Sequence, residues 1–151
     1  MVEMTTDAIR PLEKSDLGSV KQLLASRKLF YSDISSDLLT NFFAYYSPTV
    51  GGEQVLAVIG WEVFADCVLL RSLATRSNGL GLGSQLVTFA EQKICNIPRK
   101  TIYLLTTTAK NYFQRLGYQL CARETAPLSI QRSSQFSNLC PASASLMSKC
   151  L

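Results

Sequence analysis

One segment of the chain carries most of the information about its fold: Cys67-Val68-Leu69-Leu70-Arg71-Ser72-Leu73-Ala74-Thr75, then Asn78-Gly79-Leu80-Gly81-Leu82-Gly83, then Ser84 to Ile94. The first part has a nearly all-apolar first half, which is typical of a central strand covered on both faces. The last part repeats apolar residues at helical spacing. A strand, a glycine-rich turn and a helix N-terminus form a recurrent anion site, because backbone N–H groups converge there and glycine admits a ligand. Residues 78–83 are therefore predicted to bind an anion.

The glycine spacing separates different kinds of phosphate-binding loop. A Walker A loop requires G-x-x-x-x-G-K-[ST], and no lysine follows Gly83, so that class is excluded. A dinucleotide-binding loop requires G-x-G-x-x-G with an acidic residue about 20 residues further on. Here the glycines run G-x-G-x-G, and the Thr-Ile-Tyr-Leu-Leu that follows Lys100 contains no acid. The loop therefore agrees poorly with both of these patterns.

Composition excludes several classes of chemistry. The chain has 151 residues, of which 47% are hydrophobic and 17% charged, enough apolar material for one folded domain. It contains no histidine, which excludes Ser-His-Asp triads and histidine-based metal sites. The net charge of +4 fits a small anionic ligand, and the dispersed lysines and arginines match no nucleic-acid reader motif. We therefore expect neither a metal nor a nucleic-acid partner.

The cysteines and the N-terminus indicate a reducing, non-membrane environment. The five cysteines have no C-x-x-C spacing, so a zinc site or a disulfide framework is not expected; they are Cys67, Cys95, Cys121, Cys140 and Cys150. Residues 1–10 contain Glu3 and Asp7 and lack the apolar stretch of a signal peptide. No apolar run approaches the ~20 residues that span a bilayer. The expectation is a soluble, cytoplasmic protein without membrane contact.

The rest of the chain alternates strands and helices. Further strands are predicted over residues 7–11, 41–47, 54–63, 100–106 and 118–124. Helices are predicted after Ser15 or Asp16, over 34–40 with Ser32 or Asp33 as cap, and from Thr107 or Thr108 to Leu116-Gly117. In the tail we expect a helical turn to Ser133, a strand over 135–139 and an irregular or helical end after Pro141. Together these elements predict an α/β (α+β) fold, a mixed and mostly antiparallel sheet with helices on both faces.

Three segments of the chain, and their order along it, resemble the GNAT superfamily of acyl-CoA-dependent N-acetyltransferases. The glycine loop and the helix after it look like the [QR]-x-x-G-x-[GA] segment of that superfamily, with Asn78 taken as the [QR] position. Ile9-Arg10-Pro11 followed by Ser15-Asp16-Leu17 resembles the first strand and helix of these enzymes. Ala109 to Tyr118 resembles their A-x-x-[LF]-Y-x-x-x-G-[FY] step from helix to strand. The resemblance covers about residues 7–125.

The resemblance implies both a topology and a cofactor, acetyl-CoA. The strand ending at Thr75 would splay from a parallel neighbour ending near Thr106, and pantetheine would insert between them like an added strand. Backbone N–H groups at Leu73 and Thr75 would hold pantetheine and the acetyl carbonyl, which gives Leu73 a catalytic role in stabilising a tetrahedral intermediate. The residues expected to bind the cofactor are Leu73, Ala74, Thr75, Asn78, Gly79, Leu80, Gly81, Leu82, Gly83, Ser84, Thr108 and Phe113.

Two positions depart from the superfamily pattern. Asn78 is a shorter hydrogen-bonding residue than glutamine or arginine, although the glycines still supply N–H groups. Phe113 stands where many relatives have a tyrosine that protonates the departing thiolate, and phenylalanine has no proton to donate. Tyr112 is adjacent but points about 100° away on a helix. Either another group supplies the proton or CoA leaves as a thiolate; we favour the second, since a thiol pKa is near 8.5.

The candidates for the base and the acceptor site are polar residues beside apolar strand segments. Glu62 is the first candidate for the general base, with a solvent-exposed hairpin end as the alternative. Arg71 interrupts an apolar strand and needs a partner, which is either Glu62 or a substrate carboxylate. Ser72, Thr106, Thr107 and Asp33 are the other acceptor-binding candidates, and strand packing or helix capping is the alternative for each.

A narrower resemblance concerns the acceptor. Leu70-Arg71-Ser72-Leu73-Ala74, Tyr103 to Ala109 and Leu139 to Ala144 resemble the GNAT branch encoded in bacterial arsenic-resistance operons. It implies a small primary amine as substrate, an amino acid or an arsenic-containing analogue of one. A CoA-binding regulatory module without turnover and a protein or peptide N-acetyltransferase remain as alternatives. We expect one domain over residues 1–151, with 126–151 as a C-terminal extension near the acceptor site, and a homodimer remains open.

Overall fold

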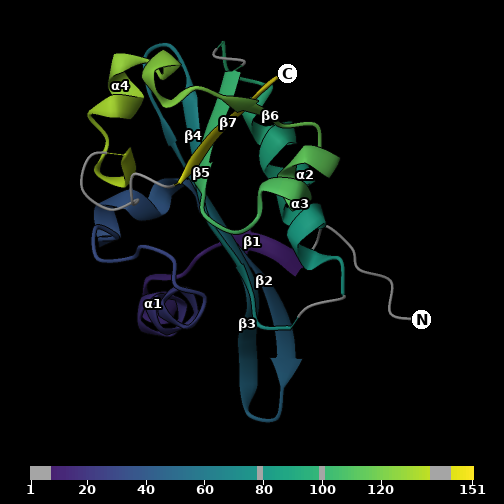
Figure 1. Ribbon diagram of the computed structural model, residues 1–151. Coiled ribbons are helices and arrows are strands. Elements are labelled where there is room, and N and C mark those ends of the chain that lie inside the picture. The colour runs from purple at the N-terminus through teal and green to yellow at the C-terminus, as the bar shows by residue number, and fades with distance from the viewer. Residues whose placement is uncertain (1–7, 78–79, 99–100, 137–143) are drawn as a thin grey trace. The chain divides into compact units, whose positions relative to one another are not determined.

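The computed structural model describes residues 8–77, 80–98, 101–136 and 144–151 (Figure 1). Its described strands are β1 (Ile9–Pro11), β2 (Phe42–Thr49), β3 (Gly52–Val63), β4 (Val68–Thr75), β5 (Thr101–Thr106), β6 (Gln119–Cys121) and β7 (Ser145–Cys150). Its α-helices are α1 (Leu17–Ser26), α2 (Leu82–Ile94), α3 (Lys110–Arg115) and α4 (Leu128–Gln131). Short 3-10 helices span Lys14–Asp16, Ser36–Asn41 and Arg123–Thr125.

The described strands form one mixed sheet in the order β1-β2-β3-β4-β5-β7-β6. Strands β4 and β5 are parallel, whereas β1/β2, β2/β3, β5/β7 and β6/β7 are antiparallel. The apolar strand at residues 67–75 occupies the middle of this order, as its sequence predicts. The predicted fold class, a mostly antiparallel sheet with one parallel pair and helices, is therefore confirmed.

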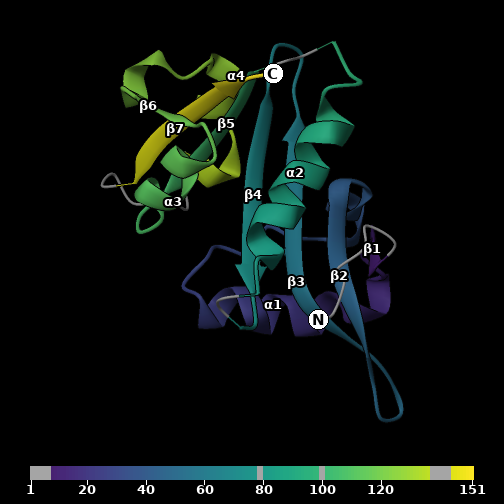
Figure 2. The same cartoon turned by 90° about the vertical axis from the view of Figure 1, so that its right-hand side faces the viewer.

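The tail differs from the prediction. Residues 145–150 form strand β7, which lies between β5 and β6 (Figure 2), where an irregular or helical end was expected. The expected strand at 135–139 is also wrong at Gln135 and Phe136, which are helical; residues 137–139 lie outside the described residues. Strand β7 has no alternating pattern because Leu146 and Met147 are both buried, one on each face of the sheet. Such a short run is hard to distinguish from a helical segment.

The chain divides into two compact units. The first comprises residues 1–61 and 72–90, and the second comprises 62–71 and 91–151. The backbone of β3, β4 and α2 passes from one unit to the other.

In the first unit, α1 and α2 cover opposite faces of β2 and β3 (Figure 1). Val20 and Leu24 of α1 belong to a buried cluster with Phe42 and Ala44 of β2. The ring of Phe43 stacks on that of Trp61 at 5.3 Å and lies 5.0 Å from the ring of Phe89 in α2. Adjacent residues of a strand point to opposite faces. The cluster around Phe42 and the aromatic stack around Phe43 therefore form two separate layers, one on each face of β2. The helical pattern predicted for both helices is confirmed.

Gly60 is required by the ring that crosses it. Phe42 pairs with Gly60 between β2 and β3, and its side chain is fully buried. A Cβ atom at residue 60 would lie 2.6 Å from the nearest carbons of the Phe42 ring, well inside van der Waals contact. The glycine therefore allows a large aromatic side chain to lie flat over the neighbouring strand.

We predict that Gly60→Ala destabilises the protein by about 1–3 kcal/mol, since the buried ring must shift to accept a methyl group. Gly18→Ala is the matched control: Gly18 lies in α1 with nothing within 4 Å of its Cβ position, so alanine there leaves stability unchanged or raises it. Chemical denaturation of both variants measures the difference. Equal effects at the two glycines would contradict this explanation of Gly60.

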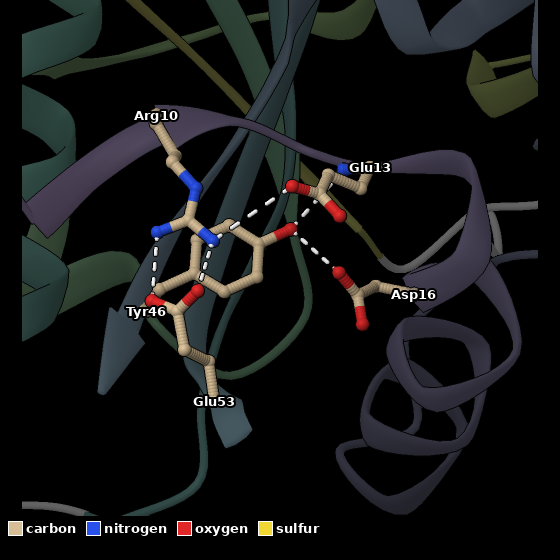
Figure 3. A network of polar contacts seen from close by, with 5 residues as sticks. All are labelled: Arg10, Glu13, Asp16, Tyr46 and Glu53. Atoms are coloured by element: carbon tan, nitrogen blue, oxygen red, sulfur yellow. Dashed lines mark hydrogen bonds and ion pairs between the residues drawn. The ribbon is translucent and has the colours of Figure 1, made fainter. Parts of the chain in front are cut away.

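A tyrosine of β2 anchors the start of α1 (Figure 3). The Tyr46 hydroxyl donates to Asp16 Oδ2 at 2.8 Å and accepts the backbone N–H of Glu13 at 3.1 Å. Arg10 lies over the Tyr46 ring, 3.8 Å from its centroid, and donates to both carboxylate oxygens of Glu53. Burial and the hydrogen bond to Asp16 raise the pKa of Tyr46 to about 12, so this hydroxyl stays protonated at neutral pH. The contacts assign Asp16 and Tyr46 a structural role.

In the second unit, helices also pack on both faces of the strands. Ile130 of α4 joins Leu69 of β4 and Leu146 of β7 in a buried cluster. On the other face, Lys149 of β7 donates to the carboxylate of Glu91 at 3.1 Å and to the Leu116 carbonyl at 2.9 Å. These contacts connect the last turn of α2 and the end of α3 to β7.

Candidate functional site

The predicted site begins where β4 changes its backbone conformation. Ser72 has φ +60°, which is uncommon for a residue with a side chain, and it is buried. Such a conformation costs of order 1–3 kcal/mol and persists only where surrounding contacts impose it. The left-handed residue turns the backbone, so the groups of Leu73, Ala74 and Thr75 follow a path that a regular strand would not take. Of these three residues, Ala74 is buried and the other two are half-buried.

The glycine loop leads into α2 as predicted. Asn78 and Gly79 lie outside the described residues; Leu80 is exposed, and Gly81 has φ +71°. The helix starts at Leu82, and its first turn closes with the Gln85 N–H donating to the Gly81 carbonyl at 3.2 Å. The N–H groups of a first helical turn have no acceptor within the helix, and the helix dipole adds partial positive charge there. An ideal Cβ on Gly81 meets nothing within 4 Å, so open space adjoins this turn.

Arg76 is a loop residue that the sequence analysis missed. Its backbone N–H donates to the Leu56 carbonyl at 2.8 Å, and its Nε donates to the Val55 carbonyl at 2.6 Å. The signal is present in the sequence: Arg76 precedes Gly79 by three residues and Gly81 by five, which satisfies [QR]-x-x-G-x-[GA] directly. In this register Arg76, and not Asn78, matches the [QR] position.

Arg71 and Glu62 contact each other. Arg71 Nη1 donates to Glu62 Oε2 at 3.2 Å; the Arg71 side chain is 0% exposed and that of Glu62 is 19% exposed. The sequence leaves two possible partners for Arg71, Glu62 and a substrate carboxylate. In the structure Arg71 contacts Glu62. The alternative for Glu62, a side chain that points to solvent at an exposed hairpin end, is wrong. A buried guanidinium without compensating charge is destabilising, and the Glu62 carboxylate supplies such a charge to the arginine that β4 carries among apolar residues.

We predict that Glu62→Gln lowers the free energy of unfolding by about 1–3 kcal/mol, because it removes the negative charge that faces a buried guanidinium. Glutamine keeps an oxygen that can accept from Arg71. Glu53→Gln is the matched control, because it alters an ion pair at the surface. The Glu53 side chain is 49% exposed and that of its partner Arg10 is 36% exposed. Equilibrium unfolding in urea should show little change for the control. A loss of the same size in both variants would contradict the role of burial.

Thr106, Thr107 and Thr108 form the end of β5 and the turn before α3. Thr106 Oγ1 accepts the Ala109 N–H at 2.9 Å, and Ala109 is the N-cap of α3. The helix cap predicted at Thr107 or Thr108 is therefore wrong, because the N-cap is Ala109, which makes no side-chain capping hydrogen bond. Thr107 and Thr108 are both exposed.

Phe113 is a core residue of the second unit. It is 7% exposed, and its ring packs edge-on against Tyr112 at 5.3 Å and Tyr118 at 5.7 Å. The hydroxyl of Tyr118 donates to Glu91 at 2.9 Å, and burial raises the pKa of Tyr118 far above its ordinary value. Gly117, with φ +97°, ends α3 as the sequence predicts.

Asp33 and the other candidate residues are divided between the two units. Asp33 lies half-buried in a turn before the 3-10 helix Ser36–Asn41, whose N-cap is Ser35; the predicted cap at Ser32 or Asp33 is wrong. The first unit holds Ser72 to Thr75, Asp33 and the start of α2, and the second holds Glu62, Arg71, Thr106 to Thr108 and Phe113. Within one unit, the structure thus brings Glu62 and Arg71 together.

The described residues contain no group of three or more Cys, Asp or Glu side chains that could hold a metal ion. In the same part of the chain Cys67, Cys95, Cys121 and Cys150 are free thiols. Burial raises the pKa of Cys67 to about 11, so this thiol is not a nucleophile at neutral pH. No helix among the described residues is both long and apolar enough to cross a membrane.

Comparison with known proteins gives a fold. No protein-family model and no curated protein matches the chain. Among solved structures, N-acetylglutamate synthase from Neisseria gonorrhoeae, complexed with coenzyme A and N-acetyl-glutamate, superposes with a TM-score of 0.78 at 16% identity over 95% of this chain. This chain spans only 34% of that larger protein.

Two smaller proteins match over nearly their whole length. An acetyltransferase of the GNAT family from Staphylococcus aureus has a TM-score of 0.72 at 15% identity, covering 95% of this chain and 98% of that one. Naa50 from Arabidopsis thaliana, in complex with the bisubstrate analogue CoA-Ac-MVNAL, has a TM-score of 0.66 at 15% identity, covering 95% and 97%. The chain is therefore similar in structure to GNAT acetyltransferases and has their fold.

Proposed function

We propose that the protein is an N-acetyltransferase that transfers acetyl from acetyl-CoA to a small primary amine. The observation that carries this proposal is the path from Ser72 to Leu82 in a chain with the GNAT fold. A strand with a left-handed residue passes through a glycine loop into the N-terminus of a 13-residue helix. This arrangement presents backbone N–H groups and open space at Gly81, which suits a diphosphate.

The residues present fit coenzyme A. Leu80 to Ser84, with Asn78 and Gly79, would hold the diphosphate, and Leu73 to Thr75 would pair with pantetheine. Thr108 and Phe113 remain proposed contacts from the second unit. Bound acetyl-CoA supplies an activated acetyl group as a thioester. The N–H of Leu73 would donate to the acetyl carbonyl oxygen, the position where negative charge develops in acyl transfer.

Glu62 is the proposed base for the acceptor amine. Its side chain is 19% exposed, and Arg71 donates to Oε2, which leaves Oε1 as the oxygen proposed to take a proton. It would take the proton of the attacking amine, directly or through water. An α-amine, with a pKa near 8, requires less of this base than a lysine amine near 10.4. This difference favours an acceptor with an α-amine over a lysine side chain.

The acceptor is proposed to be an amino acid or an amino-acid analogue, including an arsenic-containing one. The superposition on a protein complexed with N-acetyl-glutamate supports this class. Arg71 is the proposed contact for the acceptor carboxylate, and Ser72, Thr106, Thr107, Asp33 and the extension over residues 126–151 stay proposed parts of the acceptor site. The similarity to a protein in complex with a peptide bisubstrate analogue keeps a peptide acceptor as the second candidate.

An acceptor screen tests the proposed function. The purified protein is incubated with acetyl-CoA and, separately, amino acids, arsenic-containing amino acids, simple amines and short peptides, and the released thiol is measured with a thiol reagent. We expect release that depends on an acceptor with an α-amine and a carboxylate. Calorimetric binding of acetyl-CoA without release for any acceptor would indicate a binding module instead. Release with peptides alone would favour the second candidate.

The carboxylate role of Arg71 has a separate prediction. Arg71→Lys keeps a positive charge toward Glu62 but loses the planar fork that binds a carboxylate through two hydrogen bonds. It should raise KM for an amino acid by about tenfold or more, and much less for the amine that lacks the carboxyl group. Steady-state kinetics on this matched pair of acceptors gives the ratio. Equal KM changes for both acceptors would leave Arg71 with its structural role alone.

A further inference from the structure

Arg27 holds the backbone at the start of the glycine loop. It is the C-cap residue of α1 and is exposed. Its Nε donates to the Thr75 carbonyl at 3.0 Å, and its Nη2 donates to the Arg76 carbonyl at 2.9 Å. One planar guanidinium therefore binds two successive carbonyls, and both belong to residues where β4 passes into the loop. All of these groups lie in the first unit.

These hydrogen bonds fix the direction of the neighbouring N–H groups. In a planar trans peptide the C=O and the following N–H point in opposite directions. The Thr75 carbonyl faces Arg27, so the Arg76 N–H faces away, and it donates to the Leu56 carbonyl. The Arg76 carbonyl also faces Arg27, so by the same geometry the N–H of Ser77 points away from Arg27. The contacts of Arg27 thus fix the orientation of the first two loop amides, those of Arg76 and Ser77.

The same contacts place positive charge beside the loop. Both acceptors that the structure gives to Arg27 are carbonyls, which do not neutralise its charge. Arg76 also donates through Nε to a carbonyl, that of Val55. Two guanidinium groups are therefore attached to the backbone within a few residues of Gly81, where an anion would be attracted.

We propose that Arg27 is a positioning residue for the diphosphate of coenzyme A, which rests on the proposed function. It acts through the carbonyls of Thr75 and Arg76, which hold the first loop amides in a fixed orientation, and it adds positive charge at this end of the loop. A residue at the C-terminal end of α1 thereby influences how tightly a loop about 50 residues later in the chain binds the diphosphate.

The test compares three variants by calorimetry with two probes, coenzyme A and S-acetylpantetheine, which lacks the diphosphate. Arg27→Gln should weaken coenzyme A binding by about tenfold and leave S-acetylpantetheine binding unchanged. Arg27→Lys keeps the charge but cannot span both carbonyls, so it should give an intermediate loss. Lys28→Gln is the matched control: it removes one exposed positive charge at the next residue and should change affinity by less than about twofold. Thermal unfolding and Trp61 fluorescence verify that each variant is folded.

The outcomes separate the two proposals. If the wild-type protein does not bind coenzyme A, the proposed function and the role of Arg27 both fail. If the wild type binds and Arg27→Gln binds equally well, the role of Arg27 alone fails. A loss of the same size for both probes, or for Arg27→Gln and Lys28→Gln, would also overturn it, because general damage or net charge would then explain the effect.

Discussion

The central strand of this protein buries five consecutive residues, Val68 to Ser72, and one of them is charged. Val68, Leu69, Leu70 and Arg71 of β4 are each less than 5% exposed. A strand covered on both faces has no route to solvent for a guanidinium, so its charge must be matched inside the protein. Glu62 supplies that match nine residues earlier in the chain. The strand then adopts positive φ at Ser72 and continues toward the loop.

Three of the described arginines donate to backbone carbonyls. Arg27 donates to the carbonyls of Thr75 and Arg76, Arg76 to that of Val55, and Arg123 to that of Ala144. Thr75 is the last residue of β4, and Ala144 immediately precedes β7. A carbonyl at a strand end has no ladder partner, and a guanidinium with several donors can satisfy it without introducing an acid. Arg10 and Arg71 instead donate to the carboxylates of Glu53 and Glu62.

The sequence predicted those parts whose pattern depends on neighbouring residues. The apolar run 67–75, the glycines and the helical stripe of α2 are local signals, and the strand and the helix they predict are both present. Strand β7 was missed because burial on both faces removes the alternation that identifies a strand, and its pairing with β5 depends on distant residues. The cap of α3 was assigned to Thr107 or Thr108, one or two residues too early, since the N-cap is Ala109, a residue type that gives no capping signal. The choice of Glu62 as partner of Arg71 depends on the folded arrangement of β3 and β4, which no local pattern encodes.

The aromatic residues near α3 limit how the proposed reaction can end. Phe113 has no proton, and it is packed between Tyr112 and Tyr118. Tyr118 keeps its proton in a hydrogen bond to Glu91, and burial raises its pKa further, so its hydroxyl is committed to the core. Neither residue is suited to protonate a leaving group. A thiol with pKa near 8.5 lies about 1.5 units above neutral pH, so leaving as a thiolate costs only about 2 kcal/mol relative to the protonated form. Within the proposed function, the demand on the protein therefore falls on deprotonating the amine and stabilising the acetyl oxygen, the steps assigned to Glu62 and to the backbone after Ser72.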